Sequence, residues 1–298
     1  MKRMILIVFL LTLMLSAAAV AASERQKQAD RHTALPARAQ RIVSLGPLNT
    51  ENLYLLGAGD RLVGDTSYCV RPEAAKHKPK IGSVMQVSIE KIISLHPDLV
   101  LATALTRPEQ INQLEKMGVR IVRFRQPASF AEICGQFIEL GKLLGLEERA
   151  RQIVSQAREE VAALQRRLVP LPKKKVFLQV GSRPLFASVP GSFTHDFIAL
   201  AGGVNIAGDQ RTGTMQVEKV IAENPEVIII AIMGSETGIA AEEKKNWRQM
   251  YVLKAAQTGR IHTIDPDLVC SPSPATFTQT LRIIATLIHP ELDGQKDE

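Results

Sequence analysis

Hydrophobic and polar positions along this chain form the same pattern twice. A short amphipathic run, a proline turn and an unbroken apolar run occupy residues 90–101, and the same order returns at residues 218–229. The first copy reads Glu-Lys-Ile-Ile and then Pro-Asp-Leu-Val-Leu, and the second reads Glu-Lys-Val-Ile and then Pro-Glu-Val-Ile-Ile. Such a pattern predicts a short helix followed by a buried strand. Two similar lobes are therefore the first structural hypothesis, and function is sought between them.

Strand and helix patterns alternate on both sides of the chain's middle. In the first half we expect strands at 41–45, 61–65, 98–102 and 119–124, and helices at 49–56, 88–95, 108–117 and 130–144. In the second half we expect strands at 175–180, 227–231 and 260–264, helices at 193–201, 216–223, 247–256 and 275–288, and a proline-containing loop at 265–274. This alternation predicts parallel sheets flanked by helices, so the fold class is α/β.

A different pattern separates the two halves. Residues Glu147–Leu168 contain no Gly or Pro, and apolar residues recur among them at helical spacing. One helix of this length spans roughly 33 Å. It is either an ordinary surface helix or, as its central position favours, the rigid connector of the lobes. The predicted organisation is a signal peptide at 1–22, a flexible tail at 23–40, an N-terminal lobe at 41–145, the connecting helix at 146–170, a C-terminal lobe at 171–290 and a disordered tail at 291–298.

The N-terminus has the pattern of a secretory signal peptide. Lys2 and Arg3 precede the apolar run Met4–Leu15, and small residues at 17–22 offer a cleavage site. The apolar run is shorter than the ~20 residues that span a bilayer, which disfavours a membrane anchor. No Cys stands at the cleavage site, so a lipid anchor is not indicated. We therefore expect export to the periplasm.

Composition narrows the function classes. The net charge of +7 comes from scattered basic residues, and aromatic residues make up only 4% of the chain, which is not the pattern of a nucleic-acid-binding protein. The three cysteines lack the spacing of a zinc site, and Cys134 lies in a helical pattern as a core residue. No Gly-x-Ser-x-Gly or His-Glu-x-x-His motif is present, and no Gly-x-Gly-x-x-Gly opens a helix. An exported enzyme is therefore the weaker alternative to a binding protein.

Five stretches, taken in their order and spacing, resemble the ABC-transporter substrate-binding proteins that serve vitamin B12, ferric siderophores and haem and that have a single-helix connector. They are Arg41–Glu51, Thr66–Cys69, Glu90–Leu101, Gly202–Ile206 and Glu218–Ile229. Tyr68–Pro72 and Lys175–Gln179 are most similar to the vitamin B12-binding branch. The resemblance implies two α/β lobes with a ligand cleft between them. It also implies a monomer that works with an inner-membrane permease dimer and its ATPase.

The resemblance assigns a role to Glu90 and Glu218. In this family one Glu on each lobe pairs with arginines of the permease, and these two residues stand at the corresponding positions. Exposed carboxylates form charge-assisted bonds with Arg, and complementary charge speeds docking. Both residues also suit the first turn of a helix, where the dipole favours negative charge. The two explanations are compatible.

Loops that follow strand ends line a cleft between parallel-sheet lobes. In this chain such loops supply the candidate ligand-binding residues Tyr68, Cys69, Arg71, Met85, Arg183, Phe186, Phe193, Met215 and Cys270. Aromatic rings and methionines pack against an organic macrocycle, and arginines hold an anionic chelate. The sulfur-containing members form a soft-ligand set, but their spacing matches no known metal site, so no metal ligand is predicted. For each candidate the alternative is ordinary loop packing or solvation.

The transported ligand implied by the resemblance is a corrinoid, and no resident cofactor is expected. Vitamin B12-binding relatives place tryptophans in the cleft, whereas the single Trp of this chain, Trp247, lies in a helical stretch. A haem, a ferric siderophore or a bare metal ion or oxyanion therefore stays as an alternative ligand. A sensory or adhesive relative of the same fold stays as an alternative function. Because a long helix resists bending, we expect only slight closure of the cleft on binding.

Overall fold

Two sheets organise the part of the chain that the structure describes. The structure is a computed structural model, and it describes residues 39–233 and 238–294. The predicted signal peptide and most of the tail at 23–40 lie outside these residues, whereas Ala39 is already buried. At the other end η3 (Pro290–Gly294) is a 3-10 helix, so the tail predicted as disordered at 291–298 begins with regular structure.

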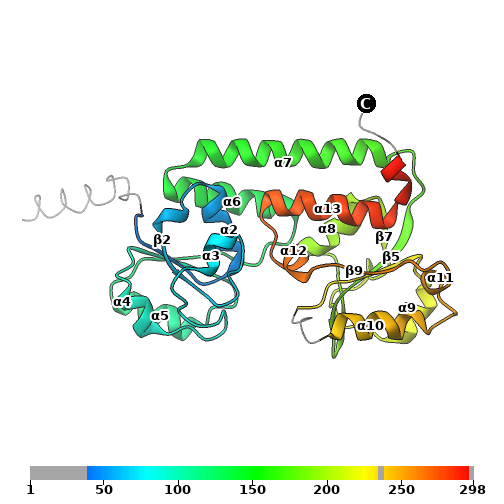
Figure 1. Cartoon of the computed structure of the whole chain (residues 1–298), viewed down its shortest axis with the longest axis horizontal. Helices are drawn as coiled ribbons and strands as arrows, with labels where there is room; N and C mark the ends of the chain where they lie inside the picture. The colour runs from blue at the N-terminus through cyan, green and yellow to red at the C-terminus, as the bar shows by residue number, and fades with distance from the viewer. Residues whose placement is uncertain (1–38, 234–237, 295–298) are drawn as a thin grey trace, which may run out of the picture. The chain divides into compact units, whose positions relative to one another are not determined.

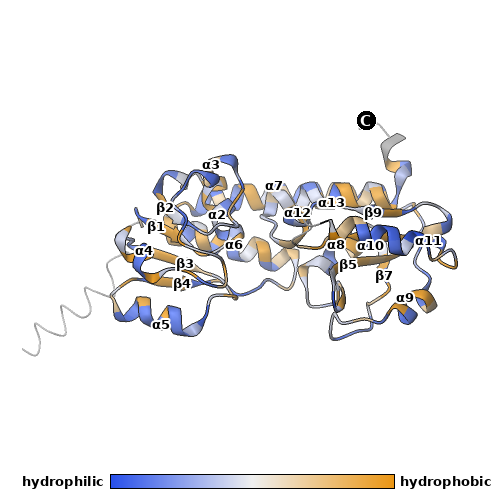
Figure 2. Cartoon of the chain, turned by 60° about the horizontal axis from the view of Figure 1, so that its bottom comes forward, coloured by the Kyte–Doolittle hydropathy of each residue, from blue (hydrophilic) through white to orange (hydrophobic). Residues whose placement is uncertain are grey.

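The first sheet consists of parallel strands in the order β2-β1-β3-β4. Its strands are β1 (Ile42–Ser44), β2 (Leu62–Asp65), β3 (Leu99–Ala102) and β4 (Ile121–Arg123). Its helices are α2 (Pro47–Leu55), α3 (Glu73–Lys76), α4 (Ile89–Ser94), α5 (Pro108–Lys116) and α6 (Phe130–Leu144), with the 3-10 turn η1 (Gly59–Arg61). Strands β1 and β3 are buried throughout, as unbroken apolar runs predict. Figure 2 shows β3 and β4 as hydrophobic and the outer helix α5 as mostly hydrophilic.

The second sheet adds an antiparallel edge to the same plan. β5 (Lys174–Ser182) pairs in parallel with β7 (Gly203–Asn205) and β8 (Val227–Ile230), β8 pairs in parallel with β9 (Ile261–Thr263), and β6 (Leu185–Ala187) folds back on β5. The helices are α8 (Phe193–Leu200), α9 (Val217–Glu223), α10 (Ile239–Arg248), α11 (Lys254–Gln257), α12 (Pro266–Cys270) and α13 (Pro274–Ile288). The predicted class, two α/β lobes with parallel sheets, is confirmed, although β6 and β7 were not predicted.

Helix α7 (Glu147–Leu168) joins the two lobes and has the bounds that its pattern predicts. Figure 1 shows it in green, and it packs against α6 and α13. The turn from α6 into α7 requires Gly145, because this residue has a positive φ of 68° that other residues rarely adopt. The buried stripe of α7 consists of Ala150, Val154, Ala157, Val161, Leu164 and Leu168.

The two lobes also share a hydrophobic core. Phe277 on α13 stacks on Phe130 of α6 with 4.5 Å between ring centroids, and on Phe197 of α8 with 4.3 Å. The backbone N–H of Phe130 donates to Asp196 Oδ2 on α8 at 2.7 Å. The lobes therefore meet through packed side chains as well as through α7.

Two predicted elements of the second half were wrong. Trp247 lies in the last turn of α10, which begins at Ile239, so the helix expected at 247–256 is in fact the end of one helix, a turn and the short α11. The loop expected at 265–274 contains α12. There Asp265 accepts the N–H of Asp267, and Pro266 occupies the first helical position, where a missing N–H costs nothing.

Candidate ligand-binding cleft

A cavity of about 440 Å³ lies between the two lobes. Its wall is mostly apolar and includes Leu105, Phe124 and Phe193. Small-molecule sites in proteins are concave, largely apolar and roughly 300–1,000 Å³ in volume. Tyr68 and Met85, also in the wall, expose 56% and 52% of their surface. The cavity therefore offers unpaired apolar surface to an organic ligand.

The N-terminal lobe supplies most of this wall through the loops that follow its strands. Carboxyl ends of parallel strands lie at one edge of a sheet, so these loops gather there. Gly46, after β1, permits a close approach, since a Cβ at that position would lie 2.5 Å from Thr103 Cγ2 after β3. Arg123 of β4 fixes the same loop by donating to the carbonyls of Thr103 and Ala104 at 3.2 and 2.9 Å.

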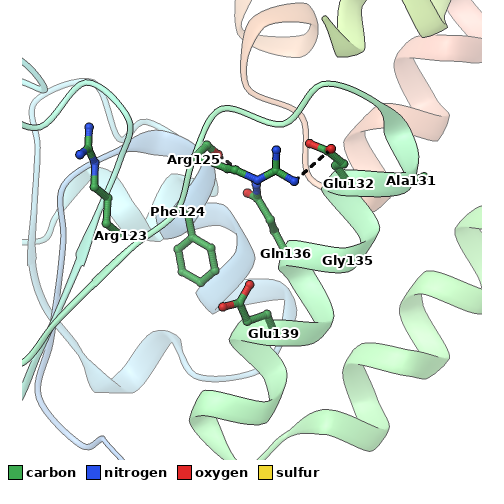
Figure 3. A pocket seen from close by; sticks show the side chains of 8 residues that line it. All are labelled: Arg123, Phe124, Arg125, Ala131, Glu132, Gly135, Gln136 and Glu139. Atoms are coloured by element: carbon green, nitrogen blue, oxygen red, sulfur yellow. Dashed lines mark hydrogen bonds and ion pairs between the residues drawn. The ribbon is translucent and has the colours of Figure 1, made fainter. Parts of the chain in front are cut away.

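A second, more polar hollow of about 480 Å³ adjoins the cavity. Phe124, Arg125 and Gln136 line both spaces, and Figure 3 shows how their side chains lie. Arg125 pairs with Glu132 at 3.0 Å, and the Gln136 amide donates to the Arg125 carbonyl at 3.0 Å. The N–H of Ala128, together with the Arg125 guanidinium, lowers the pKa of the Glu132 carboxyl, so this pair is ionised at neutral pH. The apolar cavity thus has a charged rim on one side.

A polar cluster joins the lobes beside the cavity. Glu51 of α2 forms an ion pair with Arg71 at 2.9 Å. The same carboxylate accepts hydrogen bonds from the hydroxyls of Ser273, at 2.6 Å, and Thr276, which lie at the start of α13 in the other lobe. Arg71 also donates to the carbonyl of Ser271 at 3.2 Å. Residues 270–272, next to this cluster, line the cavity.

The structure brings four of the predicted site residues to the cavity: Tyr68, Met85, Phe193 and Cys270. Phe193 begins α8 directly after its cap, Ser192, and is almost fully buried. Burial raises the pKa of the Cys270 thiol to about 12. Without a metal, that thiol is therefore neutral at physiological pH. Contact between these residues and a ligand stays a prediction.

Two predicted residues are buried elsewhere. Cys69 has no exposed surface, and its sulfur lies 3.2 Å from the hydroxyl oxygens of both Thr50 and Thr66; burial raises the pKa of the Cys69 thiol. Met215 packs in the core of the C-terminal lobe with 5% of its surface exposed. Its N–H donates to the carbonyl of Leu185 on β6, which holds this segment against the sheet. The expectation that the loop at Met215 faces the cleft was therefore wrong.

The three remaining candidates do not line the cavity. Arg71 belongs to the polar cluster between the lobes. Arg183 lies in the turn between β5 and β6, 3.9 Å from Glu242, with 85% of its side chain exposed. Phe186 lies on β6 over Gly213, where a Cβ would approach the ring to 2.1 Å. Neither Arg183 nor Phe186 lines the described cavity.

Several lining residues were not predicted. Leu48, Leu105, Phe124 and Met233 follow β1, β3, β4 and β8. All four lie in segments that follow strand ends, where a ligand cleft is expected. A single apolar residue in such a segment gives no further sign in the sequence that it lines a cavity. Among the described residues, no group of three or more His, Cys, Asp or Glu side chains is arranged to hold a metal ion. In the same part of the chain, no helix is long and apolar enough to cross a bilayer.

The repeated glutamates occupy equivalent places in the two lobes. Glu90 is the second residue of α4 and Glu218 the second residue of α9, and both are exposed. Each helix leads through a turn into a fully buried central strand, β3 or β8. Among the contacts described for this part of the chain, neither glutamate side chain forms a hydrogen bond or an ion pair. Both carboxylates are therefore available for intermolecular pairing.

Comparison with known proteins places these features in a family. A model of the periplasmic binding proteins matches residues 42–268. An ABC transporter substrate-binding lipoprotein of Bacillus subtilis is 30% identical over 261 residues, which are 85% of this chain and 81% of the relative. A vitamin B12-binding protein of Yersinia pseudotuberculosis is 34% identical over 201 residues, which are 66% of this chain and 71% of the relative. The solved structure of a periplasmic heme-binding protein of Roseiflexus superposes with a TM-score of 0.74 and 26% identity, covering 85% of this chain and 98% of that one.

Proposed function

The chain belongs to the periplasmic binding protein family, and we propose that it is the substrate-binding component of an ABC importer. It captures a metal–organic chelate, with a corrinoid as the leading candidate, and delivers it to an inner-membrane permease with its ATPase. It acts as a receptor rather than an enzyme, and the chelate is cargo rather than a resident cofactor. The proposed location is the periplasm, reached through the predicted signal peptide.

The apolar cavity between the lobes is the observation that carries this proposal. Tyr68 and Met85 on one lobe expose apolar surface to this space, and the almost fully buried Phe193 of the other lobe lies in its wall. A chelate with a broad organic ring system buries such surface, and burial contributes roughly 25 cal/mol per Å². The vitamin B12-binding and heme-binding relatives support a ligand of this class.

Haem is the second candidate ligand, because the cavity wall contains no tryptophan among its described residues. Trp247 is buried instead in the C-terminal lobe, where its indole N–H donates to Gln179 Oε1 at 2.7 Å. The charged rim at Arg125 suits an anionic substituent of either macrocycle. The shared core of the lobes supports the expectation that the cleft closes only slightly, since large hinge motion would separate Phe130 from Phe277.

Isothermal titration of the purified protein with cyanocobalamin, dicyanocobinamide, haemin and a ferric siderophore tests the proposal. We expect one chelate to bind with one-to-one stoichiometry. Tyr68→Ala removes a half-exposed ring from the wall and weakens that binding about tenfold, because ring burial contributes roughly 1.5–3 kcal/mol. Tyr251→Ala is the matched control, since Tyr251 is 76% exposed and lies outside the cavity. Binding of a bare metal ion or oxyanion, with no binding of any chelate, contradicts the proposal.

A further inference from the structure

We infer that Glu51 is a positioning residue that latches residues 271–276 of the C-terminal lobe to the N-terminal lobe and thereby sets one wall of the cavity. This inference rests on the proposed function, because the cavity is taken as the ligand site. It assigns Glu51 and Arg71 an indirect role, with no contact to the ligand. The cluster contacts both lobes.

The two oxygens of Glu51 face different lobes. Oε2 lies 2.9 Å from Nη2 of Arg71 in the same lobe, and this contact is an ion pair without hydrogen-bond geometry. Oε1 accepts from Ser273 Oγ at 2.6 Å and from Thr276 Oγ1 across the lobe boundary. Only 10% of the Glu51 side chain is exposed, so water competes poorly for these bonds. Hydrogen bonds to a charged group in such surroundings are stronger than those between neutral groups.

Arg71 extends the same contact across the boundary. Its Nη2 donates to Ser271 O at 3.2 Å while it pairs with Glu51, so one guanidinium holds the backbone just before the residues that Glu51 holds. Its Nη1 is buried without a hydrogen-bond partner among the described residues, which leaves Nη2 as the group that makes these contacts. The segment 271–276 is thus tied to the N-terminal lobe at both ends.

This segment connects the latch to the cavity wall. Cys270, Ser271 and Pro272 line the cavity, and the latch holds the chain directly after them. Ser273 is also the N-cap of α13 and accepts the N–H of Thr276 at 3.1 Å, so Glu51 contacts the residue that starts this helix. A displaced segment would therefore change the cavity wall and the first turn of α13 together.

The other directional contact described between the lobes, from the Phe130 N–H to Asp196 Oδ2, holds α6 to α8 and does not involve residues 271–276. The stacked rings of Phe130, Phe277 and Phe197 form an apolar contact, and apolar packing is non-directional. Buried polar groups, in contrast, favour one arrangement because displacement leaves them unsatisfied. The latch is therefore the described polar contact that fixes the placement of the wall segment itself.

Hydrogen exchange of the ligand-free protein, read on peptides that cover residues 270–279 and 47–56, tests the latch without any ligand. Glu51→Gln keeps an acceptor oxygen but places an amide against the Arg71 guanidinium, and we expect about tenfold faster exchange in residues 270–279. Thr276→Val removes one donor, keeps the Glu51–Arg71 pair and should give a smaller acceleration in the same place. Glu160→Gln is the matched control, because Glu160 pairs with Arg282 of α13 at 3.0 Å outside the cavity wall.

Affinity for the chelate that binds the wild-type protein, tested with cyanocobalamin and haemin, supplies the second readout. We expect about tenfold weaker binding for Glu51→Gln, a smaller loss for Thr276→Val and no loss for Glu160→Gln. Unchanged exchange in residues 270–279 overturns the latch, and so does uniform acceleration over the whole chain, which would indicate general destabilisation. Local acceleration with unchanged affinity overturns the positioning role. If neither chelate binds the wild-type protein, the proposed function falls, and the exchange measurement still decides whether Glu51 holds the segment.

Discussion

The two copies of the repeated stretch are alike in their helix, turn and strand, and they differ in the loop before the helix. In the N-terminal lobe this loop carries Met85 to the cavity, with half of its surface exposed. In the C-terminal lobe the similar Met-Gln-Val stretch lies two residues closer to the repeated Glu, and its methionine, Met215, is buried in the core. Val87, which stands opposite Met215 in the repeat, is buried as well. The loops differ in what packs on them, because Leu185 and Phe186 of β6 pair with residues 214–215.

A repeated helix and strand therefore do not imply a repeated binding surface. The antiparallel hairpin of β5 and β6 occurs only in the C-terminal lobe of the described chain, and it pairs with the loop before α9. In the N-terminal lobe the loop before α4 closes on itself through the pairing of Gly82 with Val87, and the loops of this lobe supply most of the cavity wall. The repeat is therefore symmetrical toward the proposed permease side and asymmetrical toward the ligand.

Loss of both repeated glutamates has the largest expected effect. Glu90→Ala combined with Glu218→Ala should reduce uptake of the chelate more than about hundredfold, because each removes a charge-assisted contact worth roughly 1.5–3 kcal/mol. Ligand affinity should be unchanged, since both residues lie outside the cavity. Uptake by cells that depend on this protein, compared with titration of the purified variant, measures the two quantities. The control combines Glu115→Ala with Glu242→Ala, one exposed acid from each lobe. If uptake survives, the two glutamates have no role in docking and the repeat has only a structural role.

The two methionines should separate binding from stability. Met215→Ala leaves a hole in a packed core, so we expect a loss of about 2–4 kcal/mol in the free energy of unfolding. Met85→Ala should cost little stability and should weaken chelate binding, because this side chain is half exposed in the cavity wall. Urea unfolding and calorimetric titration of both variants provide the comparison. Equal stability losses would show that the loop at Met85 is packed as firmly as its counterpart.

Local signals allowed much of the fold to be predicted. Helix α6 has the predicted bounds because Ser129 caps it and Gly145 ends it, and both are features of the nearby sequence. The strands β3 and β8 were predicted because unbroken apolar runs lie in buried parallel strands. The position of β6 could not be predicted, since a three-residue edge strand exists only through its pairing with β5 and residue 214.

Part of the candidate site could likewise be predicted from local signals in the sequence. Tyr68 and Met85 were found because they lie in loops near strand ends, which is a property of sequence order. Met215 was placed wrongly because a distant strand decides its burial. The cluster of Glu51 with Ser273 and Thr276 joins residues more than 220 positions apart, and no pattern within either segment indicates that contact.

The lobes also differ in the charge of a polar side chain that each buries in a strand. In the N-terminal lobe this group is Asp65, which has no exposed surface and pairs with Lys80 at 2.7 Å. In the C-terminal lobe it is the neutral Gln179, whose amide contacts Trp247, Glu243 and the carbonyl of Gly181. Burial raises the pKa of Asp65 to about 6; the pair with Lys80 acts in the opposite direction and is outweighed.

Burial of Asp65 should therefore make the stability of the N-terminal lobe depend on pH. The folded state holds the Asp65 proton more tightly than the unfolded state, so its contribution is complete below about pH 4 and is lost as pH rises to about 6. A shift of this size corresponds to roughly 3 kcal/mol. Urea unfolding at several pH values should show this loss in the wild-type protein and not in Asp65→Asn. Acids with lowered pKa, such as Asp209 beside Lys219, act in the opposite direction, so the difference between the two proteins is the quantity to compare. A difference that does not vary with pH would contradict the assignment.

The smallest expected effect concerns the N-cap residue, which directly precedes each repeated helix. Ser88 caps α4 by accepting the N–H of Lys91, whereas Gln216 at the same position of α9 makes no side-chain cap. Ser88→Ala should therefore cost about 1 kcal/mol in the free energy of unfolding, and Gln216→Ser should add up to about 1 kcal/mol. The backbone of Gln216 is already extended, with φ −99° and ψ 147°, so Ser fits that position without rearrangement. Urea unfolding of both variants measures the two effects. If Gln216→Ser adds nothing while Ser88→Ala costs stability, the pairing of β6 with residues 214–215 already fixes the start of α9, and the same contact that buries Met215 also replaces the missing cap.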